Sequence, residues 1–493
     1  MFVLVLILLG CIISAVWSRI RPRQPSPPVF PGALPLIGHA HLSIGLDAKA
    51  FWKLEKKIYD FCSKNGGVTE IHTSIRLKPV YVITDLEDCL LVANTCFDKD
   101  IILYKYVKEM YNRGLLTAGP STWKPHRKLL NPAFNLQVLN TLVSEHNTQA
   151  RSLVTQLACE VGKGPFDVLP YLIKNVLMTV YRTTLGKTTD GQNVMKYSHA
   201  TEYLFELYLD RFQRVWLHSQ FLFNMSIIKK KQDEVIDTIK NITSTVIKER
   251  KIELKRRQSL SSDSDPSSDN FKPLLDYMLE LADTQNAFTD EEIREHLDTI
   301  IAGAYDSTTK ALTFTLILVG SHPDVQAKLY KELQDVLGGQ DRDIERHDLP
   351  KLVYLEAVIK ESLRLLPPAP RIARTCRAAI KLKKYTLPAG CTCVLVLSYI
   401  NRHPMWGPDA DQFKPERWLE PASLPNNANA FASFGMGKRN CIGKQYAMMG
   451  IKTYLANILR QYHVTGDVSN VETRCDIFLT PISGHHISLE LRT

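Results

Sequence analysis

Helical patterns run through most of the chain without a break in composition, and this feature limits the fold more than any other. They extend from residue 86 to about residue 255 and return at residues 289–321, 324–337 and 352–365. The last of these stops at a proline-rich LPPAP, because proline cannot continue a helix. The sequence has no internal repeat. We therefore expect a mainly α fold with a minor β-rich part, in a single large catalytic domain at residues 38–493.

Two short regions carry the pattern of strands instead. Residues 68–84 alternate and are rich in β-branched side chains, which predicts a hairpin. Residues 379–398 predict short strands with a turn at Pro388-Ala389-Gly390, and the end of the chain predicts a further hairpin. Residues 256–270, RRQSLSSDSDPSSDN, are polar and low in complexity. Such a segment buries little apolar surface, so we expect a surface loop within the domain.

The first seventeen residues are almost entirely apolar, and a basic, proline-rich run follows them. The apolar stretch is slightly shorter than the about 20 residues of a spanning helix. A cleaved signal peptide, the competing interpretation, carries positive charge before its apolar stretch, whereas Arg19, Arg21 and Arg23 come after it. Charge in that position favours a membrane anchor at residues 1–17 whose following domain stays cytoplasmic. Residues 18–37 would form a semi-stiff spacer.

Charge and cysteine usage narrow the partners. The net charge is +10, from 61 basic and 51 acidic residues. The basic runs have no interleaved aromatic residues and no zinc-ligand spacing, so we expect no nucleic-acid partner, but rather an acidic protein or lipid headgroups. Ten cysteines without disulfide-like spacing favour a reducing compartment. Cys391 and Cys393 have no companion cluster in the sequence, so we expect strand packing there rather than a metal site.

A single cysteine, Cys441, lies where the glycine-rich turn of FASFGMGKRNCIGKQYA gives way to a helical pattern. A helix that begins there would direct backbone N–H groups and the positive end of its dipole at the sulfur, which lowers the pKa of the thiol. Gly443 leaves room for a flat group against the backbone. These residues alone leave three interpretations open: an inert core cysteine, a reactive thiol, or the single thiolate ligand of a metal cofactor.

Glu361 and Arg364 lie three residues apart on a helical pattern, close enough for an ion pair. If that face is buried, the pair needs a further partner to satisfy its hydrogen bonds. Arg417, within FKPERW, is the candidate third member. An ordinary exposed helix salt bridge is the simpler alternative for Glu361 and Arg364.

The segment IAGAYDSTT, at residues 301–309, combines small side chains with an acid and alcohols in the middle of a helical pattern. The Ser307 hydroxyl can donate to the carbonyl of Gly303 and distort the helix locally. Asp306 and Ser307 would then lie beside a pocket in which an acid and a hydroxyl relay protons. Packing and capping effects are the alternative explanation for these residues.

Several cations lack an acidic neighbour in the sequence. Trp123 and Arg127 lie one helical turn apart in WKPHRK, and both can donate to an anionic group. Arg374 and Arg439 likewise have no obvious partner. Together, these side chains suggest a site for a buried dianion.

In their order along the chain, these segments resemble the cytochrome P450 superfamily, the haem-thiolate monooxygenases. The shared series is W-x-x-x-R, a G-x-D-S/T-like segment, E-x-x-R, P-E-R and F-x-x-G-x-R-x-C-x-G, and it covers about residues 25–490. GLLTAGPSTWKPHRKLLNPAF, YLEAVIKESLRLLPPAP and RNCIGKQYAMM look like the family 4 group, which has many insect members.

The resemblance implies a role for each candidate residue. Cys441 would be the axial ligand of a haem iron, and its thiolate would favour O–O cleavage. Phe434 would pack on the sulfur side and Gly443 would lie against the haem. Asp306, Ser307 and Thr308 would serve proton delivery to bound dioxygen. The haem propionates would be bound by Trp123, Arg127, Arg374 and Arg439, and the segment behind the haem would be held by Glu361, Arg364 and Arg417.

The sequence departs from the family pattern at two positions. Ser307 stands where the alcohol is usually threonine, and it lacks the methyl group that limits the rotamers, so proton delivery would be leakier. Thr308 could partly substitute. Gly303 stands where family 4 members often carry a glutamate that forms an ester with the haem, so the resemblance here implies a noncovalent haem b.

The reaction that the resemblance implies inserts one oxygen atom of O2 into a lipophilic substrate such as a fatty acid, hydrocarbon, hormone or xenobiotic. The chain has no flavin or nicotinamide fingerprint, so electrons would come from NADPH through cytochrome P450 reductase, with cytochrome b5 as an optional second donor. The implied location is the endoplasmic reticulum membrane, with the domain on the cytoplasmic face. The alternative is a haem-thiolate isomerase or dehydratase that does not use O2.

Overall fold

The computed structural model describes most of the chain. The described residues are 26–35, 37–72, 79–99, 104–186, 191–260, 271–339 and 341–492. The expected anchor at residues 1–17 and most of the expected spacer lie outside them. Among the described residues, no helix is both long enough and apolar enough to cross a bilayer.

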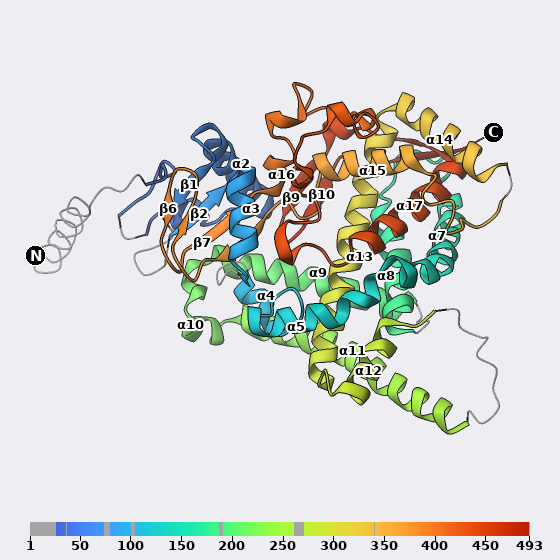
Figure 1. Ribbon diagram of the computed structural model, residues 1–493, viewed down its shortest axis with the longest axis horizontal. Helices are drawn as coiled ribbons and strands as arrows, with labels where there is room; N and C mark the ends of the chain where they lie inside the picture. The colour runs from blue at the N-terminus through green and yellow to red at the C-terminus, as the bar shows by residue number, and fades with distance from the viewer. Residues whose placement is uncertain are drawn as a thin grey trace, which may run out of the picture.

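Helix α13 (Asp290–Gly320) runs through the middle of the molecule, and the other helices pack around it (Figure 1). It starts with a capping box in which Thr289 and Glu292 satisfy each other's backbone N–H groups. Most of its residues from Ile293 onward are buried. The remaining helices are α2 (Ala48–Lys64), α3 (Leu86–Thr95), α4 (Tyr104–Tyr111), α5 (Pro120–Leu130), α6 (Leu136–Leu139), α7 (Val143–Leu157), α8 (Leu169–Leu185), α9 (Gly191–Gln213), α10 (Gln220–Asn224), α11 (Ile227–Leu260), α12 (Leu274–Gln285), α14 (Pro323–Leu337), α15 (Val353–Leu365), α16 (Leu397–Ile400) and α17 (Lys444–Gln461).

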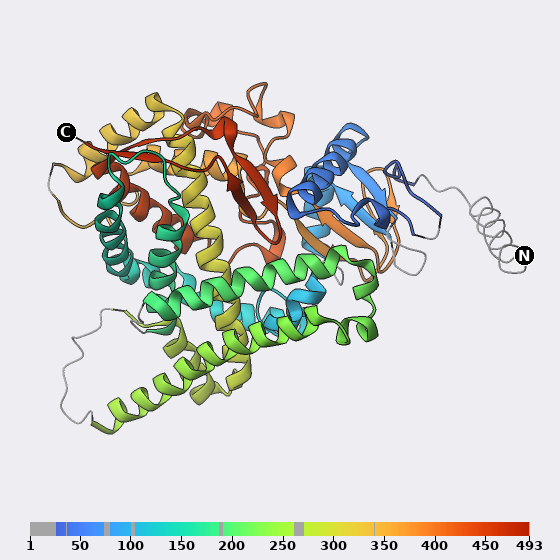
Figure 2. The ribbon, with the colours of Figure 1, turned by 180° about the vertical axis from the view of Figure 1, so that it is seen from behind.

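A five-stranded sheet forms one end of the molecule, at the left of Figure 1 and at the right of the reverse view in Figure 2. Its order is β1 (Val68–Ile71), β2 (Val80–Ile83), β7 (Thr392–Leu395), β4 (Ile372–Thr375) and β3 (Asp98–Lys99). Strands β1 and β2 form the expected hairpin, and β7 joins β2 in parallel. Three two-stranded sheets pair β5 (Ile380–Lys381) with β6 (Thr386–Leu387), β9 (Glu472–Cys475) with β10 (Leu479–Ser483), and β8 (Tyr462–Thr465) with β11 (Ser488–Leu491).

The fold confirms the expected class, mostly helix with small sheets, and corrects several boundaries. Helix α11 continues to Leu260, so residues 256–260 are helical rather than loop. Arginine and glutamine, both good helix formers, extend it until the serine-rich stretch begins. Residues 261–270 lie outside the described part. At the end of the chain, β9 and β10 form a hairpin, but the last strand pairs with the distant β8.

Candidate functional site

The loop that carries Cys441 is a tight turn fixed by glycines. The N–H of Cys441 donates to the carbonyl oxygen of Phe434 at 2.8 Å, which closes the turn. Gly435 and Gly437 have φ values of 74° and 68°, in the left-handed region that favours glycine. A Cβ atom at Gly437 would also lie 2.6 Å from the carbonyl oxygen of Ala93. The loop is therefore held against α3, and this contact fixes the position of Cys441.

The helix that follows Cys441 begins later than expected. Gly443 is the N-cap and α17 starts at Lys444, not at Cys441. The N–H of Gly443 still reaches the thiol and favours its ionised form, as do the charges of Arg127 and Lys444. Burial outweighs these effects and raises the pKa of the Cys441 thiol. The expectation that the helix start alone lowers the pKa of this thiol is thus wrong: the thiolate needs an adjacent positive centre such as a metal ion.

The Cys441 side chain is nevertheless accessible, although surrounding atoms raise its pKa. Both observations hold for a sulfur that faces a hollow enclosed by protein. Helix α13 presents a second accessible patch within an otherwise buried stretch, at Gly303, Ala304 and Ser307. A Cβ atom at Gly303 would meet nothing within 4 Å. Helix α17, which follows the cysteine loop, packs against α13.

The acid and the alcohol on α13 have separate partners. The Ser307 hydroxyl donates to the carbonyl oxygen of Gly303 at 2.7 Å, as expected from the sequence. Asp306 accepts from Lys310 through both carboxylate oxygens, each 2.7 Å from Nζ. Thr308 is buried on the same helix. Lys310 was not among the residues expected at the site, although an acid followed four residues later by lysine is a favoured helix pair and could have indicated it.

Buried cations lie close together around Arg439, two residues before Cys441. Arg439 donates to the carbonyl oxygens of Phe97 and Ala118 at 2.7 and 2.6 Å, and its guanidinium lies 4.6 Å from the ring centre of Trp123. Burial, and then the charge of Arg374, lower the pKa of Arg439 to about 9. Burial likewise lowers the pKa of Arg374.

Lys99 joins this cation group, although nothing in the sequence pointed to it. Burial, Arg374 and Arg439 lower the pKa of Lys99 well below its ordinary value. Lys99 on β3 lies opposite Arg374 on β4 in the strand register. The two residues are far apart in the sequence, so no local pattern could predict this contact. Among the described residues, no acceptor meets Nε of Arg374 or of Arg439. Cations that repel one another in a buried place favour an anionic group between them.

Arg127 lies on the cysteine side of this group. Its guanidinium donates to the carbonyl oxygen of Asn440 at 2.9 Å and to the side chain of Asn131 at 2.7 Å. Its charge also lowers the pKa of Arg439. Trp123, one turn earlier on α5, is buried and stacks on Phe97. The four residues expected to bind a dianion therefore lie near one another.

Glu361, Arg364 and Arg417 form a buried network. Oε1 of Glu361 accepts from Arg364 at 2.8 Å and from Arg417 at 2.9 Å, and Oε2 accepts from Arg364 at 2.8 Å. Trp418 Nε1 and the N–H of Lys414 satisfy the remaining positions of the carboxylate. The arginines donate further to the carbonyl oxygens of Asn401, Trp406, Asp409, Ala410 and Gln412. Side chains of α15 thereby fasten the irregular segment that leads to the cysteine loop.

These features fit a haem. An accessible sulfur, a helix face without side-chain bulk at Gly303, and a group of buried cations suit a flat metal complex with two carboxylates. The cations need an anion, and the sulfur needs a positive centre to ionise. The residues present therefore match what such a group requires.

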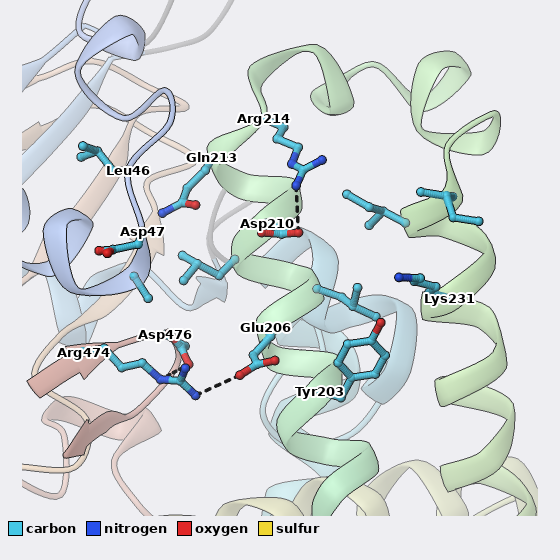
Figure 3. Close-up of a pocket in the computed structure, with 15 residues that line it drawn as sticks. Leu46, Asp47, Tyr203, Glu206, Asp210, Gln213, Arg214, Lys231, Arg474 and Asp476 are labelled. Carbon is cyan, nitrogen blue, oxygen red and sulfur yellow. Dashed lines mark hydrogen bonds and ion pairs between the residues drawn. The ribbon is translucent and has the colours of Figure 1, made fainter. Parts of the chain in front are cut away.

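A separate cavity of about 500 Å³ lies between α9, α11, the loop before α2, and β9 (Figure 3). Its wall is partly charged: Arg474 points toward Glu206, with an N–O distance of 3.2 Å, and also pairs with Asp476. Leu207 and Ile228 contribute apolar surface. None of the expected site residues lines this cavity.

Comparisons with known proteins show the family to which the chain belongs. The family model described as Cytochrome P450 matches residues 27–488. Human cytochrome P450 4V2 is 30% identical over 486 residues, which covers 97% of this chain and 91% of the relative. Cytochrome P450 4c21 of Blattella germanica is 29% identical over 82% of both chains, and cytochrome P450 4g15 of Drosophila melanogaster is 27% identical over 96% of this chain and 93% of the relative. These matches confirm the resemblance to the family 4 group.

Proposed function

Because the chain belongs to the cytochrome P450 family and is therefore a monooxygenase of the haem-thiolate class, we propose that it uses electrons from NADPH, delivered by a reductase, to hydroxylate a lipophilic substrate. The balanced reaction converts RH, O2, NADPH and a proton into ROH, water and NADP⁺. The substrate would be a fatty acid, hydrocarbon, hormone or xenobiotic. No feature of the described residues favours the alternative, an isomerase or dehydratase that does not use O2.

Cys441 would ligate the iron of a haem b, and the buried cations would bind its propionates. The observation behind this assignment is that the sulfur of Cys441 is accessible, although the loop around it is held in place by the hydrogen bond from the Cys441 N–H to Phe434. When bound, the haem supplies the activation of dioxygen, which no amino-acid side chain provides. Trp123, Arg127, Arg374 and Arg439 would hold the propionates, joined by Lys99, and Phe434 and Gly443 would lie beside the sulfur.

The haem would be noncovalent, because Gly303 offers no carboxylate for an ester bond. The space beside Gly303 is open, so substrate carbon could occupy it. Without the rigid tether that an ester between this position and the haem would provide, the site would select the terminal carbon of a substrate less strictly.

Proton delivery would rest on Ser307 and Asp306. The Ser307 hydroxyl donates a hydrogen bond to the carbonyl oxygen of Gly303, and it would have to break that bond before it could donate into the pocket. The Asp306 carboxylate would take up a proton from solvent and pass it to Ser307, and Lys310 fixes the orientation of that carboxylate. Thr308 is the substitute alcohol if Ser307 turns away.

A basic surface around the cysteine loop supports docking of an acidic flavoprotein, cytochrome P450 reductase, with cytochrome b5 as a second donor. Lys124, Lys128, Lys438 and Lys444 are all exposed. Positive charge near the sulfur side speeds association with a negative partner. Lys438→Glu and Lys444→Glu should raise the reductase concentration needed for half-maximal turnover, whereas Lys255→Glu, an exposed lysine on α11, should not. An unchanged value in the first two variants would contradict the docking surface.

Contact with membrane lipid is supported by a run of exposed apolar side chains around α10. Trp216, Phe221, Met225 and Ile227 are each more than half exposed. Helix α10 lies at the end of the molecule that also carries the five-stranded sheet (Figures 1 and 2). Exposed apolar patches of this kind favour membrane or protein contacts. Together with the apolar residues 1–17, they support a location at the endoplasmic reticulum membrane, with the domain on the cytoplasmic face.

The proposed function is tested by reductase-dependent NADPH consumption with a panel of lipophilic compounds. We expect product formation that requires O2, NADPH and reductase together. Turnover of a hydroperoxide without reductase or O2, and no product with them, would instead identify the isomerase or dehydratase.

A further inference from the structure

Four cysteines from three separate parts of the sequence meet at one end of the five-stranded sheet. The Sγ atom of Cys376 lies 2.8 Å from that of Cys96 and 3.6 Å from that of Cys393, and the Sγ atoms of Cys391 and Cys393 are 4.0 Å apart. The sulfurs of Cys376, Cys391 and Cys393 all lie within 4.8 Å of one another. All four residues are buried. The sequence offered no companion for Cys391 and Cys393, but the fold supplies two.

The strand register explains why the sulfurs converge. Thr375 on β4 is opposite Thr392 on β7, so the next pair outward is Cys376 and Cys391. Their backbones are joined by a hydrogen bond of 3.0 Å from the N–H of Cys376 to the carbonyl of Cys391. Cys393 lies two residues further along the strand and therefore on the same face of the sheet. Cys96 reaches this face from the end of α3, where it is the C-cap residue.

The donor set suits one class of ligand. Soft thiolates select thiophilic metals, and four of them in a closed, buried arrangement are typical of structural zinc. With a Zn–S distance of about 2.3 Å, the sulfurs of a tetrahedral site lie about 3.8 Å apart. The observed 3.6 and 4.0 Å separations bracket that value. Cys96 has to shift into the group, because its sulfur lies only 2.8 Å from that of Cys376 and is not among the three sulfurs that are all within 4.8 Å of one another. We propose that Cys96, Cys376, Cys391 and Cys393 form a structural zinc site in the small sheet.

The surroundings are compatible with loading and with the resulting charge. Zinc replaces four thiol protons, which leave to solvent, and the complex then carries two negative charges. Arg374 is opposite Cys393 in the register, so a cation lies on the same face. The cluster lies below the turn at Pro388 and Ala389, which are exposed, so opening that turn would admit the ion.

The test is a paired measurement of zinc and iron in the same sample of full-length, haem-loaded protein. We expect close to one zinc per chain as isolated, or uptake of one equivalent when Zn²⁺ is added against a chromophoric chelator. Cys391→Ser with Cys393→Ser should lose the zinc. The matched controls are Cys159→Ser, an exposed cysteine, and Cys62→Ser, a buried cysteine outside the cluster; both should keep it.

Three results would overturn the zinc site. The first is wild-type protein that neither contains zinc nor takes it up. The second is zinc that persists in the double variant at the wild-type level. The third is a Cys96–Cys376 disulfide, seen as the loss of two hydrogens in the intact mass without reductant. The wild-type measurements decide the question even if a serine variant fails to fold, and Cys391→Ala with Cys393→Ala offers an apolar version of the same test.

Discussion

Lys310 donates to both carboxylate oxygens of Asp306 from one turn further along α13, with 2.7 Å to each oxygen. Both side chains are close to fully buried, and the lysine also lies over the ring of Phe478. The acid expected to serve proton delivery is thus not a free carboxylate but half of an ion pair. Its charge is compensated inside the protein, and its orientation is fixed by that partner.

Removing Lys310 should therefore destabilise the protein. Lys310→Met leaves an uncompensated, nearly buried carboxylate, which costs about 3 kcal/mol or more. The midpoint for thermal loss of the haem spectrum should fall by several degrees. Asp306→Asn combined with Lys310→Met should recover most of the loss, because no unpaired charge remains.

An exposed pair of the same spacing provides the control for this prediction. Arg214 and Asp210 are four residues apart at 3.2 Å, and both are about half exposed. Arg214→Met should change stability by less than about 1 kcal/mol. If Lys310→Met were as harmless as Arg214→Met, the buried pair would not have the role given to it here.

Substitution of Ser307 should change how much NADPH ends in product. Ser307→Ala removes the hydroxyl that would deliver protons, so the ratio of product to NADPH should fall and peroxide should rise. Ser307→Thr adds the methyl group that limits side-chain rotation, so the ratio should stay equal or increase. The measurement is product, peroxide and NADPH in the same reaction. An alanine variant with wild-type coupling would transfer the role to Thr308 or to water.

Haem should leave the protein completely on acid–acetone extraction, because Gly303 has no side chain to form an ester. Gly303→Glu fills a space with no atom within 4 Å of the new Cβ, so it should fold and, after turnover, retain part of its haem. Gly303→Ala is the control for bulk alone and should release all of it. Mass spectrometry of the extracted protein decides, and haem bound to the wild-type chain would refute the noncovalent assignment.

Haem affinity of the apoprotein should depend on pH through Arg439, whose pKa is about 9. Below that pH the guanidinium is already charged and binds the propionates at no further cost. Above it, binding must take up a proton, so the affinity should fall by up to about tenfold per pH unit. Arg439→Gln should bind haem more weakly and lack this break.

Titration of the apoprotein with haem between about pH 8 and pH 10 measures the effect. Lys99 also has a lowered pKa, so a break that survives in Arg439→Gln would point to the lysine instead. A flat profile in the wild-type chain would contradict the assignment of these cations to an anionic ligand.

Local sequence patterns predicted most of the helices and strands. The helices at 290–320, 323–337 and 353–365 agree with their expected limits within one residue, since caps and prolines mark their ends. The hairpin of β1 and β2 followed from alternation. What failed was non-local: β11 pairs with β8 rather than with its neighbour in sequence, because a strand's partner depends on packing that the alternation does not encode.

At the candidate site, too, contacts within one element were predicted and contacts between distant segments were not. The hydrogen bond from Ser307 to Gly303 follows from spacing along one helix, and so does the pair of Glu361 and Arg364. The expected lowering of the Cys441 thiol pKa was wrong, because burial, which depends on the whole fold, outweighs the effect of the helix end. Lys99 and the four-cysteine cluster were missed because strand pairing, not sequence distance, brings those side chains together.

The bond between the sulfur of Cys441 and a haem iron is the centre of this account. The most direct test is the absorption spectrum of the reduced, haem-loaded protein under carbon monoxide. We predict the long-wavelength Soret band of a thiolate ligand, and its loss in Cys441→Ser with haem still bound. A folded, haem-loaded wild-type chain without that band, or a serine variant that keeps it, would contradict the account.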